Sequence, residues 1–262
     1  MHIVVLTKPV PDPAAAAERL DADLRLDRAA SPAVVNGNDE YALEAALKLI
    51  DTHGGEITLL TMAPAAGAET MRKALAMGAT RGVLVSDPVL AGSDVRTTTS
   101  VLSTALGEMT YDLVLAGADT SDGGGGVVPA GIAARLRLPY LGNAAKIEPD
   151  PASGSVTVRR ITPTGYDVLE AAMPALIVCT QALGEPRYPS LKGIMAARSK
   201  EITTRTLESL GDSVAETGGA HAMTTVLATE RPPARGATTV VRGSAAEGAA
   251  AIVELLAARR II

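Results

Sequence analysis

The residues best suited to bind a ligand form a glycine run between a strand and a helix. Leu113–Ala116 is apolar enough for a buried strand, and it opens into the segment GADTSDGGGGVVPAG, which contains Gly123–Gly126. Glycine lets backbone N–H groups approach a ligand closely, and a helix N-terminus adds unpaired donors and partial positive charge. The segment therefore predicts a phosphate site. A flexible loop that merely tolerates glycine is the alternative.

Two other strands must end beside this loop if it is to form a site. In open parallel sheets, ligands bind beyond the carboxyl ends of the strands, and these ends fall at Thr7–Lys8, Thr61–Met62 and Ala116–Gly117. Lys8 then either neutralises a phosphate or is simply solvated. Met62 either packs on a purine or fills the core.

Polar residues on both sides of the predicted sheet end have two possible roles. Asn36–Asp39 directly precedes a helical pattern, so it either reaches the ligand or caps the helix. Asp119, Thr120, Ser121 and Asp122 either bond a ribose or cap the helix that follows the glycine run. A metal bound by Asp119 and Asp122 is less favoured than capping.

The pattern of apolar residues predicts an α/β fold. Up to residue 180, strand-like and helix-like periods alternate, as in a doubly wound, mainly parallel sheet. Between the strands, apolar residues recur at helical spacing on faces that begin at Leu43, Met71, Val95 and Val128. The predicted buried strands are Ile3–Thr7, Ile57–Thr61, Val83–Val85, Leu113–Ala116 and Ala175–Thr180.

Two segments depart from this alternation. Residues 144–172 predict a hairpin-like insertion, because the alternating stretch Ser155–Ile161 is followed by a break at Gly165. Past Thr180 the regular alternation stops, and residues 211–251 are rich in Gly, Ala, Thr and Pro, which predicts an extended arm with a short final helix near Ala249–Arg259. We therefore expect an α/β domain over residues 1–183 and a loop and arm over residues 184–262.

Composition and motifs argue against chemistry carried by this chain alone. The net charge is −5 and aromatic residues are 2% of the chain, which disfavours a nucleic-acid reader. The single cysteine, Cys179, lies in an apolar strand and predicts a buried, inert thiol. The sequence contains no GxSxG, HExxH or CxxC motif and no apolar run long enough for a membrane span. We expect a soluble, cytoplasmic nucleotide-binding module with no catalytic residues.

Several longer stretches carry a family resemblance. In order along residues 1–210, they are VVLTKPVPD, NDEYALEAALKL, ETMRKALAMGATRG, DLVLAGADTSDGGGG, MPALIVCT and EPRYPSLKGIMAARSKEI. With them the chain resembles the β subunit of electron transfer flavoproteins, a family that includes the FixA-type proteins. ETMRKALAMGA and EPRYPSLKGIMAA are the most specific stretches, whereas the C-terminal tail matches only in general character.

The resemblance implies a fold, cofactors and partners. It implies a Rossmann-like domain, similar to adenine nucleotide α-hydrolases, whose C-terminal arm wraps an α subunit in a heterodimer. One FAD would be held mostly by the α subunit, and the β subunit would bury an AMP of structural role. Electrons would pass from acyl-CoA or other dehydrogenases to a quinone oxidoreductase or another acceptor. In electron-bifurcating members a second FAD replaces the AMP.

The resemblance also assigns site residues by position. It implies that the segment Glu185–Arg198 recognises the dehydrogenase, with Leu191 as its apolar anchor. The nucleotide contacts that it implies are Leu6, Asn36, Gly37, Asn38, Asp39, Met62, Thr120, Ser121, Asp122, Gly123, Gly124, Gly125, Gly126, Val127, Val128, Pro129, Ala130 and Gly131.

Two other function classes fit an adenine-nucleotide fold. An ATP-cleaving hydrolase needs a phosphate loop near the first strand, and TKPVPDP does not supply one. A nucleotide sensor that works as a homodimer, like the universal stress proteins, would have no use for the C-terminal arm. An electron-carrier subunit without catalytic residues of its own is therefore the favoured prediction.

Overall fold

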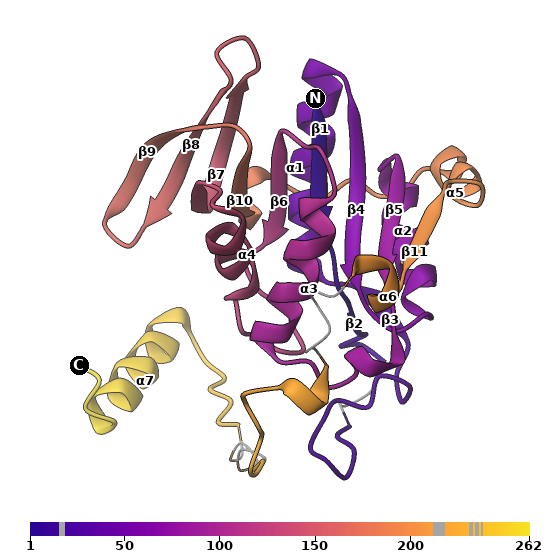
Figure 1. The fold of residues 1–262 in the computed structure, drawn as a ribbon. Coiled ribbons are helices and arrows are strands. Elements are labelled where there is room, and N and C mark those ends of the chain that lie inside the picture. The colour runs from indigo at the N-terminus through magenta and orange to yellow at the C-terminus, as the bar shows by residue number, and fades with distance from the viewer. Residues whose placement is uncertain (16–18, 212–217, 231–232, 234–235, 237) are drawn as a thin grey trace. The chain divides into compact units, whose positions relative to one another are not determined.

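A nine-stranded sheet organises the first part of the chain (Figure 1). The computed structural model describes residues 1–262 except 16–18, 212–217, 231–232, 234–235 and 237. Every neighbouring pair from β11 to β7 is parallel, so the predicted doubly wound, mainly parallel sheet is confirmed. In spatial order the strands are β11 (Ile202–Arg205), β5 (Arg81–Val85), β4 (Glu56–Met62), β1 (His2–Leu6), β6 (Leu113–Gly117), β10 (Ala175–Cys179), β7 (Tyr140–Asp150), β8 (Ser155–Thr162) and β9 (Gly165–Ala172).

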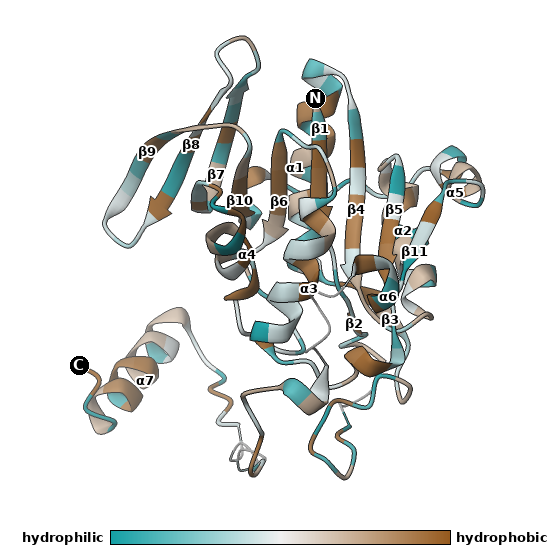
Figure 2. Ribbon diagram, in the orientation of Figure 1, coloured by the Kyte–Doolittle hydropathy of each residue, from teal (hydrophilic) through white to brown (hydrophobic). Residues whose placement is uncertain are grey.

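Helices cover both faces of this sheet. Helices α1 (Gly37–His53) and α2 (Gly67–Met77) pack on one face, and α3 (Val95–Gly107) and α4 (Val128–Leu136) pack on the other. Along β1, Ile3 and Val5 belong to the α1 side and Val4 and Leu6 to the α3 side, because successive strand residues point to opposite faces. The central strands are apolar on both faces and are brown in Figure 2.

The predicted hairpin-like insertion lies within the sheet and extends it at one edge. Strand β7 pairs in parallel with β10, and β8 and β9 then add antiparallel strands at that edge. Val156 and Val158 are buried against the α1 side, whereas Tyr166 and Val168 on β9 are exposed. A two-stranded antiparallel ribbon, β2 (Pro9–Pro11) with β3 (Ala33–Val35), leads from β1 towards α1.

Regular structure continues past residue 183, where the sequence predicts a loop and an arm. Helix α5 (Leu191–Ala197) is followed by β11, which pairs with β5, and by α6 (Leu207–Leu210). The chain splits into two compact units, Met1–Leu227 and Ala228–Ile262, and the expected boundary at 183/184 stays a prediction. Strand β11 has the sequence ITTR, and its half-exposed polar pattern carries no signal for a buried strand.

The second unit contains helix α7 (Ala245–Ala258), close to the predicted final helix. The Ser244 side chain accepts a hydrogen bond from the Glu247 backbone N–H, and the Glu247 side chain accepts one from the Ser244 backbone, which forms a capping box. In the described part of the chain, short 3₁₀ turns occur as η1 (Pro88–Leu90), η2 (Gln181–Leu183) and η4 (Gly219–His221). Within the residues that the structure describes, no helix is long and apolar enough to cross a membrane.

Candidate functional site

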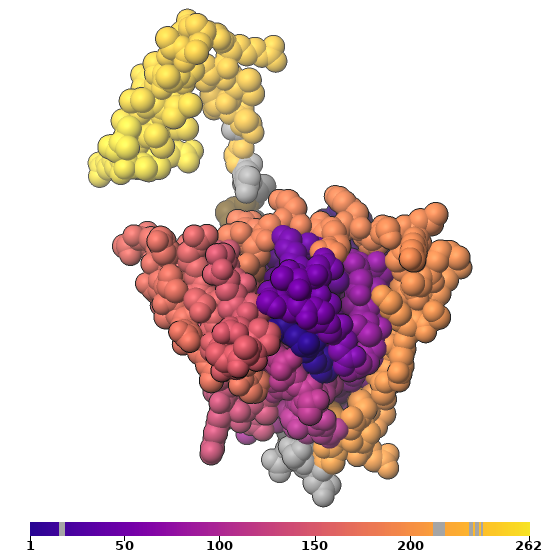
Figure 3. Space-filling model, turned by 90° about the horizontal axis from the view of Figure 1, so that it is seen from above, coloured from indigo at the N-terminus to yellow at the C-terminus, as the bar shows by residue number. Residues whose placement is uncertain are grey.

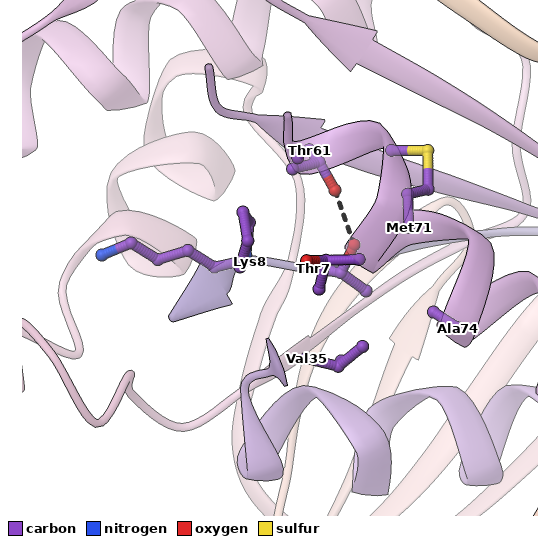
Figure 4. A pocket seen from close by; sticks show the side chains of 9 residues that line it. Thr7, Lys8, Val35, Thr61, Met71 and Ala74 are labelled. Atoms are coloured by element: carbon purple, nitrogen blue, oxygen red, sulfur yellow. Dashed lines mark hydrogen bonds between the residues drawn. The ribbon is translucent and has the colours of Figure 1, made fainter. Parts of the chain in front are cut away.

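The carboxyl ends of β1 and β4 meet, as predicted, at the edge of the sheet where ligands bind. The Thr7 and Thr61 hydroxyls are hydrogen-bonded at 2.6 Å (Figure 4). The pocket lined by these two threonines, Val35 and Met71 is too tight to hold even a water molecule. Lys8 turns its ammonium away from this pocket, so its partners must lie elsewhere (Figure 4).

Helix α1 starts in close contact with the end of β6. A Cβ atom at Gly117 would stand 2.5 Å from Asp39 Oδ1 and 2.6 Å from the backbone carbon of Asn38. No side chain fits in that space, so glycine at position 117 allows the N-terminus of α1 to reach the strand end. This contact brings Asn36–Asp39 to the same end of the sheet as the loop after β6.

Two asparagines tie the loop after β6 to the start of α1. The buried Asn36 donates from Nδ2 to the Asp119 carbonyl at 2.8 Å, and its Oδ1 accepts the Ser121 backbone N–H at 3.2 Å. Asn38 Nδ2 donates to Asp119 Oδ1 at 2.6 Å. These bonds fix residues 119–121 from one side, so the predicted meeting of Asn36–Asp39 with this loop is seen in the structure.

Asp39 is a buried carboxyl group within this junction. Its Oδ2 accepts the Lys8 backbone N–H at 2.8 Å. Burial raises the pKa of Asp39 from 3.8 to about 7, although hydrogen bonds from Asn36 and the Lys8 backbone and the charge of Lys8 act in the opposite direction. Asp39 therefore titrates near neutral pH and connects β1 with α1.

Asp122 is held by two cations. Lys8 Nζ and Arg28 Nη2 each donate to one of its oxygens at 2.8 Å. Burial alone raises the pKa of Asp122, but the hydrogen bond and charge of Lys8, with hydrogen bonds from Thr120 and Arg28, outweigh it and lower the pKa to about 2. Two positive groups and one negative group leave this cluster with a net charge of +1.

The glycine segment, Gly123–Gly126, lies exposed next to this cluster. Gly124 and Gly126 have φ of +58° and +60°, which favours glycine, and the position of a Cβ on Gly123 lies 3.8 Å from Lys8 Nζ. No side chain caps α4, which begins just after the segment, whereas Asp94 caps α3. The N–H groups at the start of α4 therefore keep their capacity to bind an anion.

The other residues implied as nucleotide contacts differ in position. The Leu6 side chain is buried in the core on the α3 side and Met62 packs against that core, so neither side chain belongs to the exposed segment. Gly37 and Val127 are exposed, Val128, Ala130 and Gly131 are half-buried, and Pro129 is buried in the first turn of α4.

Arg28 is a site residue that sequence reasoning missed. It lies between β2 and β3, and its Nη1 also donates to the Pro9 carbonyl at 3.3 Å. This loop has no helical or strand period, and residue 28 is 94 positions from its partner Asp122. Only the fold brings the two together, and a sequence signal for the contact does not exist.

The segment Glu185–Arg198 presents apolar side chains to solvent. Leu191 is 78% exposed at the start of α5, and Tyr188 and Met195 are exposed as well. Ser190 caps the helix, with the Gly193 backbone N–H donating to its Oγ at 3.0 Å. The implied anchor therefore stands on a capped helical turn at the surface.

Other chemistry finds little support in the described residues. Among them, no group of three or more His, Cys, Asp or Glu side chains is arranged to hold a metal. The Asp119 carboxylate accepts from Asn38. The Asp122 carboxylate accepts from Lys8 and Arg28. Cys179 is buried, and burial raises the pKa of its thiol, so the thiolate is disfavoured.

Known proteins are similar in sequence to this chain. The model of the electron transfer flavoprotein domain matches residues 23–210. The electron transfer flavoprotein subunit β of Mycobacterium bovis is 42% identical over 267 aligned residues, which cover 100% of this chain and 99% of the relative. Protein FixA of Azorhizobium caulinodans is 40% identical over 77% of this chain and 74% of its own.

A third relative is a subunit of a named complex. Subunit CarD of the caffeyl-CoA reductase-Etf complex of Acetobacterium woodii is 34% identical, and the match covers 100% of both chains. The Rossmann-like sheet, the ordered site at its carboxyl end and these full-length matches agree. The chain therefore belongs to the electron transfer flavoprotein family, in which it is a β subunit with a role in electron transfer.

Proposed function

We propose that this chain pairs with an electron transfer flavoprotein α subunit in the cytoplasm and binds AMP at the glycine segment. The AMP has a structural role. The chain also helps to hold an FAD carried mostly by the α subunit, and its C-terminal arm, residues 228–262, wraps that subunit. The complex carries electrons from acyl-CoA or other dehydrogenases to a quinone oxidoreductase or another acceptor, and this chain contributes no catalytic residue.

The observation that carries the nucleotide proposal is the exposed glycine segment beside a cluster of net positive charge. The start of α4 has no side-chain cap, Lys8 Nζ lies 3.8 Å from the Cβ position of Gly123, and Lys8 and Arg28 both bond Asp122, directly before the segment. Together they provide the donors and the charge that a phosphate group requires.

The rest of the site suits a nucleoside. Asn38 is half-buried and bonded to Asp119 at the edge of the segment, and the polar groups of this pair are of the kind that hydrogen-bonds a ribose. AMP supplies no redox chemistry, and FAD in the complex accepts and releases the electrons. The role of this chain's residues is therefore to bind, to orient and to maintain the shape of the complex.

Counting the nucleotides of the purified heterodimer tests this proposal. This chain is co-expressed with an α subunit, and the bound nucleotides are released by denaturation and separated. We expect one FAD and one AMP per heterodimer, and a colourless β subunit when it is purified alone. Two FAD per heterodimer would instead assign the bifurcating alternative, and a flavin-loaded, redox-active lone subunit would overturn the proposal.

Two glycines form a matched pair for locating the nucleotide. Gly124 (φ +58°) and Gly154 (φ +69°) both have open space at Cβ, and the N–H of each donates to the carbonyl four residues earlier. Alanine at a left-handed position costs about 1–2 kcal/mol, so both variants should lose similar stability. Only Gly124→Ala should lower the AMP content, and equal AMP content in the two variants would place the nucleotide elsewhere.

We also propose that Glu185–Arg198, called here the docking segment, binds the donor dehydrogenase through Leu191. An exposed apolar side chain flanked by polar residues is suited to insert into a partner's pocket. Leu191→Ala should slow electron uptake from an acyl-CoA dehydrogenase without changing the flavin content or the stability of the heterodimer. An unchanged rate would remove Leu191 from this role.

A further inference from the structure

The docking segment is fixed to α1 close to the point where it leaves the sheet. Arg187 Nε donates to Glu44 Oε2 at 2.8 Å, and its Nη2 donates to Oε1 at 3.1 Å. The Arg187 backbone N–H also donates to Oε2, at 3.1 Å. Glu44 is buried. One buried carboxylate therefore holds both the side chain and the main chain of Arg187, and charge-assisted bonds of this kind are the strong ones.

Two neighbours of Glu44 on the same helix support this attachment. Asp51 Oδ2 accepts from Arg187 Nη2 at 2.9 Å, and Lys48 Nζ donates to the Leu183 carbonyl at 2.9 Å. Residues 44, 48 and 51 are spaced by four and three positions, which places them on one face of α1. In Figure 3 the orange residues that follow β10 pass beside the indigo helix α1.

The exposed apolar side chains follow directly after this attachment. Tyr188 is 95% exposed, and Leu191 comes four residues after Arg187. A four-residue span reaches at most about 14 Å, so fixing Arg187 limits where Leu191 can stand. At the far end, Arg72 Nη1 donates to the Ala197 carbonyl at 2.7 Å. The apolar side chains are therefore held between two fixed points.

We propose that the Arg187–Glu44 pair is a positioning device that preorganises Tyr188 and Leu191 for the donor dehydrogenase. This inference rests on the docking role proposed above. A segment that is ordered before binding loses less conformational entropy when it binds. Arginine suits this role better than lysine, because its planar fork matches a carboxylate in two bonds and the lysine ammonium does not. The pair touches neither the nucleotide site nor, in this chain, any reacting group, so it acts through Leu191.

Steady-state kinetics with an acyl-CoA dehydrogenase, its acyl-CoA substrate and the intact heterodimer tests this inference. Arg187→Gln should raise the KM for the heterodimer about tenfold, which corresponds to about 1.4 kcal/mol of binding, while kcat changes less than about twofold. Photochemical reduction of the flavin, which needs no docking, should proceed at the wild-type rate. The flavin content should also equal that of the wild type. Arg187→Lys should give a KM between those of the wild type and of Arg187→Gln.

A double-mutant cycle separates positioning from general damage. Glu44→Gln should raise the KM to a similar extent, and the variant with both substitutions should be no worse than either alone, because both remove one interaction. Arg81→Gln is the matched control. It breaks another two-bond pair, with Glu56 at 2.6 and 2.7 Å, at the amino ends of β4 and β5, and it should leave the KM unchanged.

The outcomes distinguish this inference from the docking role itself. If Leu191→Ala raises the KM and Arg187→Gln does not, the docking role stands and the positioning role is overturned. If neither substitution changes the KM, the docking segment is not the recognition surface and both proposals fail. Additive effects of Glu44→Gln and Arg187→Gln, or loss of flavin in either, would overturn positioning in favour of a general structural role.

Discussion

The proposed nucleotide site and the docking segment are built in different ways. The glycine segment is exposed main chain, and two asparagine side chains tie the residues before it to α1. The docking segment exposes side chains, and charged groups on α1 and α2 hold it. A site made of backbone is best disrupted by changing glycines or their close neighbours. A segment held by charged side chains is disrupted by removing one of them.

The largest effect is expected at the contact between α1 and β6. Gly117→Val places a side chain about 2.5 Å from Asp39 Oδ1, so we expect a loss of about 4 kcal/mol, above the usual cost of overpacking. Urea denaturation measures this change. Gly37→Ala, with nothing within 4 Å of its Cβ position, is the control. Equal stability of both variants would show that α1 can move away without cost.

The next effect is the pH dependence of the free energy of unfolding, which Asp39 sets. Because burial raises the pKa of Asp39 to about 7, the folded chain keeps a proton between pH 4 and 7 that the unfolded chain releases. The stability that protonated Asp39 contributes is therefore present at low pH and falls as the pH rises through that window. We expect Asp39→Asn to remove a decrease in the free energy of unfolding of about 4 kcal/mol. Identical pH profiles of the free energy of unfolding would contradict the raised pKa.

A smaller effect is expected where α2 holds the docking segment. Arg72→Leu removes the donor for the Ala197 and Lys200 carbonyls, and hydrogen bonds to charged groups contribute about 1.5–3 kcal/mol. Amide hydrogen exchange in α5 should accelerate at least about tenfold. Amides of α4, beside the nucleotide site, should keep their rates. Acceleration in both helices would erase the distinction between the two regions.

The smallest effect is expected at the cap of α5. Ser190→Ala removes the acceptor of the Gly193 N–H, which costs about 1 kcal/mol. Because α5 is short, the loss should appear as faster exchange of its first amides with little change in global stability. Ser244→Ala, which removes the equivalent cap of α7, is a control for the method. Unchanged exchange at α5 would show that ion pairs alone order this turn.

Much of the fold could be predicted because its strands are buried on both faces. Strands β1, β4, β6 and β10 read as short apolar runs, and each was expected within a residue or two of its observed bounds. The edge strand β11 was missed because half of its side chains face solvent and its residues are polar. Sequence periodicity reports burial, so it is weakest at sheet edges.

The candidate site was predictable only in part. The position of the glycine segment after β6 follows from the order of a strand, glycines and a helix, and the proximity of Asn36–Asp39 follows from the rule for strand ends. Arg28 could not be foreseen, because the loop between β2 and β3 carries no periodic pattern. The Arg187–Glu44 pair joins residues 143 positions apart, and only the folded chain reveals such contacts.

Helix α1 serves both regions, because its first turn lies at the proposed nucleotide site and Glu44 and Asp51 hold Arg187. Exchanging residues 184–200 between relatives to redirect donor preference would therefore fail if the recipient helix lacked acidic side chains at these two positions. A working chimera would have to include the α1 residues at positions 44 and 51 together with the loop.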